Sequence, residues 1–422
     1  MGGGLAALQW VAAALFAVAL VHTFSTPAFH HLAQRYPAHA GLFHLLGEVE
    51  AVFGFWAMVL VICMFALIGK DAALHYLDSR EFTEPMFVFV VMVIAASRPI
   101  MTVALHAVQA AARLVPLPRE LAFFFCALAV LPLLGSLITE PAAMTLAAMV
   151  LRDRYFAAGL SSRLKYAIVG VLFVNISIGG TLTPFAAPPV LMVAAKWGWD
   201  FGFMMSTFGW KAALAVFVNA LAITLLFRRE LGVLRRAGDD DAVASPMPWP
   251  VTGVSLLFLT AVVFFAHNAE MYLGLFIFFL AFAHAYPQRQ DRLIMREAFL
   301  VAFFLAGLVV LGGQQQWWLK PLLLRMNEAQ VFYGAIALTA VTDNAALTYL
   351  GSLVDGLSEG FKVSLVAGAV TGGGLTVIAN APNPAGLSIL KAHFEAGEVK
   401  PLWLLAAALP PTLVAALAFR YL

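Results

Sequence analysis

The stretch GGGLTVIANAPNPAG, residues 372–386, places glycines, prolines and asparagines in the middle of an apolar segment. Its flanks, FKVSLVAGAVT and LSIL, suit a membrane span, whereas the stretch itself carries helix breakers and amides. In hydrocarbon every backbone N–H and C=O group needs a partner, so irregular backbone persists only inside protein or beside a water-filled cavity. The break therefore predicts a binding site near the middle of the bilayer. The alternative is a kinked helix that only packs.

The composition of the whole chain is that of a membrane protein. Hydrophobic residues make up 62% and charged residues 11% of the 422 residues, and the mean hydropathy is +0.90. Soluble domains carry about 25% charged residues, and about 20 apolar residues suffice to cross a bilayer. We expect an all-α polytopic protein of the inner (plasma) membrane of a bacterium, with lipid and small ions as partners. The net charge of +2 gives no indication of nucleic-acid binding.

Apolar segments form two groups of six on either side of a polar stretch. That stretch, RRELGVLRRAGDDDAVASPMP at 228–248, predicts a cytoplasmic linker because it is rich in charge and contains prolines. It separates a first repeat, residues 1–227, from a second, residues 249–422. The apolar segments are 5–24, 43–68, 86–112, 120–151, 166–195 and 206–227, then 249–267, 269–285, 296–313, 329–354, 362–390 and 401–420.

The fourth and fifth segments of the two groups are unusual in the same way. The fourth ones, 120–151 and 329–354, carry the polar tips GSLITEP and TDN between apolar arms. The fifth ones, 166–195 and 362–390, are broken, by NISIGGTLTPFAAPP in the first group and by the opening stretch in the second. Two such pairs in the same order indicate an internal repeat.

The charges around 120–151 predict that this segment is a re-entrant helical hairpin. Arg113 and Arg119 precede it, and four basic residues between 152 and 165 follow it. Positively charged loops favour the cytoplasmic side, so both ends of the segment should lie inside. The first half then crosses an odd number of times, and the second half, with its hairpin at 329–354, is inverted relative to the first.

The breaks and tips offer oxygen ligands for a small cation. Carbonyl groups freed by glycine and proline, with Thr, Ser and Asn oxygens, suit a hard cation such as Na⁺, whereas helix amino termini facing the gap suit an anion. The candidate ligands are Ser136, Thr139, Asn175, Thr181, Thr183, Thr342, Asn344, Thr376, Asn380 and Asn383.

Glu140 and Asp343 are the leading candidates for ion exchange, because each stands at a hairpin tip at what we interpret as equivalent repeat positions. Ionisable groups within spans are costly and usually functional. Burial favours the protonated carboxyl group and a bound cation favours the carboxylate, so each tip can hold either H⁺ or Na⁺. The alternative is that each carboxylate caps the following helix, a role to which aspartate is well suited.

Arg98 lies near the middle of the segment 86–112 and precedes a proline. A buried arginine needs a carboxylate partner, and the candidates are Glu140, Glu48 and Glu50. We expect a structural ion pair; the alternative is direct contact with a substrate anion.

The paired hairpins and broken helices resemble the ion transporter superfamily, and most closely its sodium/proton antiporter family. The motifs are SLITEP at 136–141, NISIGGTLTP at 175–184, TDNAAL at 342–347 and GGLTVIANAPNP at 373–384. Arsenite and sodium–carboxylate transporters belong to the same superfamily. The resemblance implies a transport domain of hairpins and broken helices, a scaffold domain that forms a homodimer, and elevator-type movement.

These patterns predict a secondary antiporter of Na⁺, or another monovalent cation, for H⁺. The rival transport hypothesis is Na⁺- or H⁺-coupled movement of a small carboxylate or oxyanion, and a rival of another class is a membrane scaffold or sensor that transports nothing. No motif in the chain indicates an enzyme, and we expect no cofactor beyond the transported ions.

Overall fold

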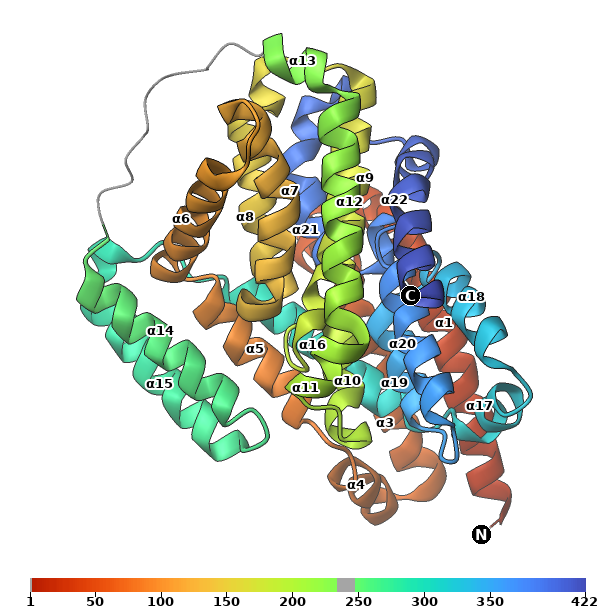
Figure 1. Ribbon diagram of the computed structural model, residues 1–422. Helices are drawn as coiled ribbons and strands as arrows, with labels where there is room; N and C mark the ends of the chain where they lie inside the picture. The colour runs from red at the N-terminus through yellow and green to blue at the C-terminus, as the bar shows by residue number, and fades with distance from the viewer. Residues whose placement is uncertain (1, 234–246) are drawn as a thin grey trace.

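The computed structural model describes residues 2–233 and 247–422, and Figure 1 shows their arrangement. Helices make up 83% of the structure, and the described residues contain no strand. Among them seven helices are long and apolar enough to cross a membrane, and one bent pair would add an eighth span. The predicted all-helical class is confirmed, and the spans agree with a polytopic membrane protein. Most of the predicted linker, residues 234–246, lies outside the described residues.

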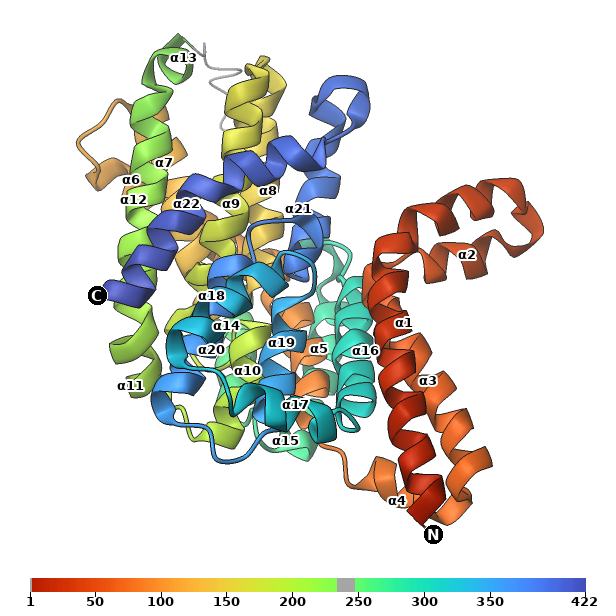
Figure 2. The ribbon, with the colours of Figure 1, turned by 90° about the vertical axis from the view of Figure 1, so that its right-hand side faces the viewer.

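One side of the molecule is built from the first helices together with α16. Figure 2 shows α1 and α3 lying side by side, with α2 projecting from them, and α16 packs against α3. The bounds are α1 Gly2–Arg35, α2 Ala40–Leu46, α3 Val49–Ile68, α4 Lys70–Asp78, α16 Met295–Gly312 and α17 Gln316–Leu323.

The predicted third span is two helices that bend by 69° relative to each other. The bend lies between α5 (Thr83–Ala95) and α6 (Arg98–Leu114), where Pro99 enters the first turn of α6. Proline is tolerated in a first turn but cannot continue a preceding helix, so it favours a break here. The pair α14 (Trp249–Phe264) and α15 (Ala269–Ala285) packs against α5 at the edge of the molecule in Figure 1.

The fourth segments each consist of two helices joined at a tip, and the fifth segments each consist of two helices joined by a break. The second arm of each tip packs on the broken segment of the other half: α8 lies against α21, and α19 lies against α10. The bounds are α7 Arg119–Ile138, α8 Glu140–Arg154, α9 Ser162–Gly179, α10 Pro188–Trp197, α18 Glu328–Thr339, α19 Asn344–Ser352, α20 Glu359–Gly372 and α21 Pro382–Leu390.

The last helix of each half closes the bundle around α9. The helix α22 (Pro401–Tyr421) packs against α9 and against α12 (Trp210–Leu226). The helix α11 (Phe201–Met204) leads through a wider turn at Met205–Gly209 into α12, and α13 (Arg228–Val233) follows it.

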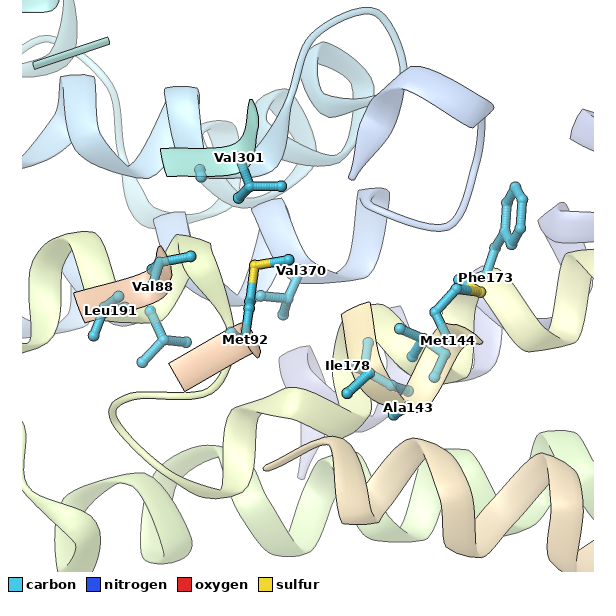
Figure 3. Close-up of a cluster of buried hydrophobic side chains, with 14 of the residues drawn as sticks. Val88, Met92, Ala143, Met144, Phe173, Ile178, Leu191, Val301 and Val370 are labelled. Carbon is cyan, nitrogen blue, oxygen red and sulfur yellow. The ribbon is translucent and has the colours of Figure 1, made fainter. Parts of the chain in front are cut away.

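Apolar side chains from both halves pack together in the interior of the molecule. Figure 3 shows Met92 of α5 beside Val370 of α20, and Ile178 of α9 beside Ala143 and Met144 of α8. All five side chains are buried. Lipid tails are as apolar as these residues, so the cluster holds the helices through close packing rather than through exclusion from water.

Gly307 allows α16 to approach α3 closely, and it gives a test of this packing. A Cβ atom at Gly307 would overlap the backbone of Phe53 and Gly54. Backbone cannot yield as a side-chain end does, so Gly307→Ala should destabilise the protein by about 1–3 kcal/mol. Thermal unfolding in detergent should show a lowered Tm. Gly274→Ala on α15 has open space around the new methyl group and serves as control; equal Tm values for the two variants would contradict the close contact.

Candidate ion-binding site

The tip of the first hairpin is a single residue in an unusual conformation. Thr139, between α7 and α8, has φ 72° and ψ 150°, and it is the one non-glycine residue with positive φ in the described parts of the chain. Such backbone costs about 1–3 kcal/mol and is concentrated at functional sites. Its hydroxyl group is buried and has no hydrogen-bond partner. The sharp turn allows α8 to begin at Glu140 directly behind the tip.

The Glu140 side chain is fully buried between the first hairpin and both broken segments. Its Oε2 accepts a hydrogen bond of 2.9 Å from Nδ2 of Asn380, and its Oε1 has no partner. Gly180 lies directly opposite, and a Cβ there would come within 2.5 Å of Oε1. The lack of a side chain at Gly180 therefore makes the space that the carboxylate occupies.

Ser136 and Thr183 join the first hairpin to the first break. The Ser136 hydroxyl donates to the carbonyl of Gly179 at 2.7 Å and accepts from the N–H of Leu182 at 2.9 Å. The Thr183 hydroxyl donates to the Ser136 carbonyl at 2.7 Å. Both hydroxyl protons are therefore donated to backbone carbonyls, that of Ser136 in the break and that of Thr183 in the hairpin. Thr181, in the short turn that follows α9, likewise donates to a backbone carbonyl, that of Ile178 in α9 at 2.7 Å.

Asp343 at the tip of the second hairpin caps α19. Its Oδ1 accepts from the N–H groups of Ala345 at 2.7 Å and Ala346 at 3.2 Å. The capping alternative is thus present at this residue. The carboxylate also interacts with the N–H of Ala381, the residue that follows the glutamate's partner Asn380. Adjacent residues of the second break therefore act on the two predicted carboxylates, Asn380 through a hydrogen bond to Glu140 and Ala381 through its backbone dipole on Asp343.

The next residue, Asn344, points into the first half of the chain. It is fully buried, its Nδ2 lies 3.4 Å from Oγ of Ser177, and its Oδ1 has no partner. A Cβ at Gly373 would come within 2.7 Å of Nδ2 of Asn344. Gly373 therefore lies directly opposite the Asn344 side chain, in the same way that Gly180 lies opposite the Glu140 side chain. Sequence analysis did not select Ser177, although the residue lies inside the first broken motif.

Each break is joined to its hairpin by a hydrogen bond of the same kind, from a threonine hydroxyl of the break to a backbone carbonyl of the hairpin's first arm. Thr183 Oγ1 donates to the carbonyl of Ser136, and Thr376 Oγ1 donates to the carbonyl of Ala340 at 2.9 Å. Each break also has a glycine against the hairpin: a Cβ at Gly179 or Gly372 would lie 2.6 Å from a carbonyl oxygen of the first arm.

This correspondence corrects the alignment of the two acidic tips. In the first hairpin the second arm begins directly after Thr139, and Ser136 lies three residues before Thr139. In the second hairpin the second arm begins directly after Asp343, and Ala340 lies three residues before Asp343. Glu140 therefore corresponds to Asn344. The tip sequences TEP and TDN predict instead that Glu140 corresponds to Asp343, which is one residue earlier. Only the first hairpin carries a carboxylate at this position.

The remaining predicted amides are buried, and two of them have free oxygen atoms. Asn383 donates to the carbonyls of Gly373 at 2.8 Å and Thr376 at 2.9 Å, and its Oδ1 has no partner. Asn380 also has an unpaired Oδ1. Thr342 is half-buried and lines a cavity with Asp343.

Asn175 is held away from the tips by a residue that sequence analysis missed. Its Nδ2 donates to Leu128 O at 2.8 Å, and its Oδ1 accepts from Asn219 Nδ2 at 2.9 Å. Both amides are buried. A lone asparagine in the apolar segment 206–227 was the available signal for Asn219. The pair joins α9 to α12 and leaves no amide oxygen of Asn175 unpaired.

The predicted partners of Arg98 were wrong. Its Nη1 lies 3.9 Å from Oδ1 of Asp291, in the loop before α16, and the side chains are 25% and 75% exposed. Glu48 pairs instead with Arg296 at 2.6 Å. The bend between α5 and α6 brings Arg98 to this loop, which the apolar pattern of a continuous span did not reveal. The carboxylate partner exists but lies outside the tips.

Comparison with known proteins identifies the family of the chain. No curated protein matches the chain, and within the described residues no three His, Cys, Asp or Glu side chains gather as a metal cluster. A family model with the description "Putative Na+/H+ antiporter" matches residues 7–422. The match spans nearly the whole chain, so the protein belongs to this family of antiporters.

Proposed function

We propose that the protein is a secondary active transporter that exchanges Na⁺, or another monovalent cation, for H⁺ at Glu140. The observation that carries the proposal is the Glu140 carboxylate, which is fully buried and whose Oε1 has no partner. A carboxylate in such a place can hold either a proton or a small cation. Because the two compete for one group, the gradient of one can drive the movement of the other.

The unpaired oxygen atoms around Glu140 support a cation as the second ligand. A buried polar group without a partner costs about 1–3 kcal/mol, and a bound cation would offset that cost. We assign Glu140 and Asn380 to the exchange centre, and we assign Asp343 a position beside it because its cap occupies Oδ1. The further oxygen atoms available are Oγ1 of Thr139 and Oδ1 of Asn344 and Asn383.

We also propose that residues 1–227 and 249–422 are inverted repeats with re-entrant hairpins. The repeated Thr–carbonyl hydrogen bonds and the exchange of arms, α8 on α21 and α19 on α10, support the repeat. The basic residues on both sides of the first hairpin support its return to the same face. Elevator-type movement within a homodimer is the mechanism that the family resemblance implies.

The test is proton movement in liposomes that contain the purified protein and a trapped pH dye. An imposed Na⁺ or Li⁺ gradient should move protons in the opposite direction, and a choline chloride gradient of equal strength should not. Absence of proton movement with every monovalent cation would refute the antiporter. Uptake of labelled carboxylates or oxyanions in that case would favour the anion-transport hypothesis.

Cation binding should also be visible without transport. A ligand that binds only the folded state at about 100 times its Kd stabilises that state by about 2.7 kcal/mol. We expect Na⁺ to raise the Tm of the detergent-solubilised protein at constant ionic strength, and low pH to diminish this rise because protons occupy Glu140. A rise that is equal for Na⁺ and choline would speak against a specific site.

A further inference from the structure

We propose that a cavity at the end of α15 binds the headgroup of an anionic phospholipid. The cavity lies between the last turns of α15 and the loop that leads into α16, and no residue of the hairpin tips lines it. Lipid binding there does not depend on the proposed ion exchange, and it can be measured without transport.

The cavity has a volume of about 350 Å³, and both apolar and polar side chains line it. Leu280 and His284 line it from α15, and Gln290, Asp291 and Arg292 line it from the loop. The side chains of His284, Asp291 and Arg292 are exposed, so the cavity is open to the surroundings of the protein. Its size suits a small polar group such as a phosphate with its ester substituents.

Gln290 presents both of its side-chain polar atoms to this cavity without a partner. Its Nε2 and its Oε1 are buried, and neither makes a hydrogen bond. A buried amide in this state is costly, and most such groups in proteins are paired. A phosphate oxygen can accept from Nε2, and a hydroxyl group of the headgroup can donate to Oε1. A phosphoglycerol headgroup offers both.

The charges at the cavity favour an anion. Arg292 lines it, and the described residues hold no ion-pair partner for this guanidinium group. The carboxylate of Asp291 also lines it, but Nη1 of Arg98 lies 3.9 Å from Oδ1 of Asp291 and offsets its charge. The positive charge of Arg292 therefore remains. Arginine binds phosphate through charge-assisted hydrogen bonds, and basic pockets beside membrane helices bind anionic lipid headgroups.

Two exposed aromatic residues place the cavity at the level of the lipid headgroups. The helices α14 and α15 lie side by side and are joined by residues 265–268, so the start of α14 and the end of α15 lie at the same end of the pair (Figure 1). Trp249 begins α14 and is 82% exposed, and Tyr286 follows α15 and is 48% exposed. Tryptophan and tyrosine gather at the membrane–water interface.

The surface of α15 next to the cavity suits the acyl chain of the same lipid. Ile277 is 67% exposed and lies three residues before Leu280 and seven before His284. Residues at this spacing share one face of a helix. An acyl chain can therefore lie along Ile277 while its phosphate enters the cavity at Leu280 and His284.

The test is thermal unfolding of the full-length protein in a neutral detergent, titrated with phosphatidylglycerol or with phosphatidylcholine of the same acyl chains. A ligand that binds the folded state raises the Tm in a concentration-dependent way. We expect phosphatidylglycerol to raise the Tm and phosphatidylcholine to raise it far less, because phosphatidylcholine has no net negative charge and no headgroup hydroxyl. Equal rises with the two lipids would overturn the proposal.

Inorganic phosphate distinguishes a lipid from a free anion. Added without lipid, it should leave the Tm almost unchanged, because it has no acyl chain to lie along α15. A rise equal to that with phosphatidylglycerol would overturn the lipid assignment, since the cavity would then take the free anion.

Two variants test the residues that hold the headgroup. Arg292→Gln removes the unpaired charge at an exposed position, and Gln290→Leu removes the unpartnered amide. Each should weaken the apparent affinity for phosphatidylglycerol about tenfold, the usual effect of losing a hydrogen bond to a charged group. Without lipid, the Tm of Gln290→Leu should equal or exceed that of the unaltered protein, because the variant no longer buries an unpaired amide.

The matched control is Arg289→Gln, which removes the same charge from the same loop but does not change a residue that lines the cavity. It should lose much less affinity than Arg292→Gln. Equal losses in the two arginine variants would overturn the proposal, because the lipid would then respond only to the charge of the surface. Unchanged affinity in both Arg292→Gln and Gln290→Leu would overturn it as well.

Discussion

Glu140→Gln should abolish Na⁺-driven proton movement, to the level of liposomes without protein. Glutamine has nearly the same shape and can still accept the hydrogen bond from Asn380, but it cannot ionise and so cannot alternate between a proton and a cation. The folded protein should keep its stability within about 1 kcal/mol, because glutamine keeps the hydrogen bond and adds no buried charge. The Na⁺-dependent rise in Tm should disappear as well.

A matched control for this variant lies on the same helix. Asp153→Asn removes a carboxylate at the far end of α8, where the side chain is 61% exposed and pairs with Arg152. Surface pairs of this kind contribute about 0–1 kcal/mol, so transport should persist. Proton movement in Glu140→Gln at the rate of Asp153→Asn would rule out Glu140 as the exchange group.

Gly180→Ala should cause a similar loss of transport with no change of charge. The backbone at Gly180, φ −74° and ψ −5°, suits any residue, so the new methyl group is the whole perturbation. It would lie 2.5 Å from Oε1 of Glu140 and 2.7 Å from Cγ, so the carboxylate must move away from Asn380. We expect proton movement to fall about tenfold or more, since a strained contact of about 1–3 kcal/mol forces that displacement.

Gly253→Ala on α14 provides the comparison for the glycine variant. Its new methyl group meets no atom within 4 Å, and alanine favours helix over glycine by about 0.8–1.0 kcal/mol. Transport should be unchanged and the Tm equal or higher. If Gly180→Ala also transports normally and keeps its Na⁺-dependent Tm, the close approach between Gly180 and Glu140 has no role in exchange.

Much of the site could be recognised from local sequence signals. The glycines and prolines at 179–189 and 372–386 mark the breaks, because they remove side chains and backbone donors that a continuous helix needs. Sequence analysis could select four polar residues because each stands in an apolar segment: Glu140, Asn344, Asn380 and Asn383. A polar side chain within a membrane span is costly, so it usually has a function. All four are fully buried in the structure.

Other features depended on contacts between distant segments. The bond between Asn380 and Glu140 joins the two halves of the chain, and no pattern within either half specifies such a pair. Ser136 and Thr183 were predicted as ligands. In the structure the Ser136 hydroxyl binds the backbone of the break, and the Thr183 hydroxyl binds the backbone of the hairpin. Arg98 meets Asp291 because α5 and α6 bend by 69°, which a continuous apolar pattern does not indicate.

By itself the sequence determined the helical membrane class, the positions of the breaks and tips, and the polar residues that stand there. These follow from hydropathy and from the backbone chemistry of glycine and proline, which act over a few residues. Only the tertiary structure decided that Glu140 joins Asn380 of the other half and keeps one oxygen unpaired. The helix cap at Asp343, by contrast, is a local contact that the sequence offered as an alternative. The difference of one residue between the two tips arises where the hairpins dock on the breaks, because hydrogen bonds between separate segments set which side chain points inward.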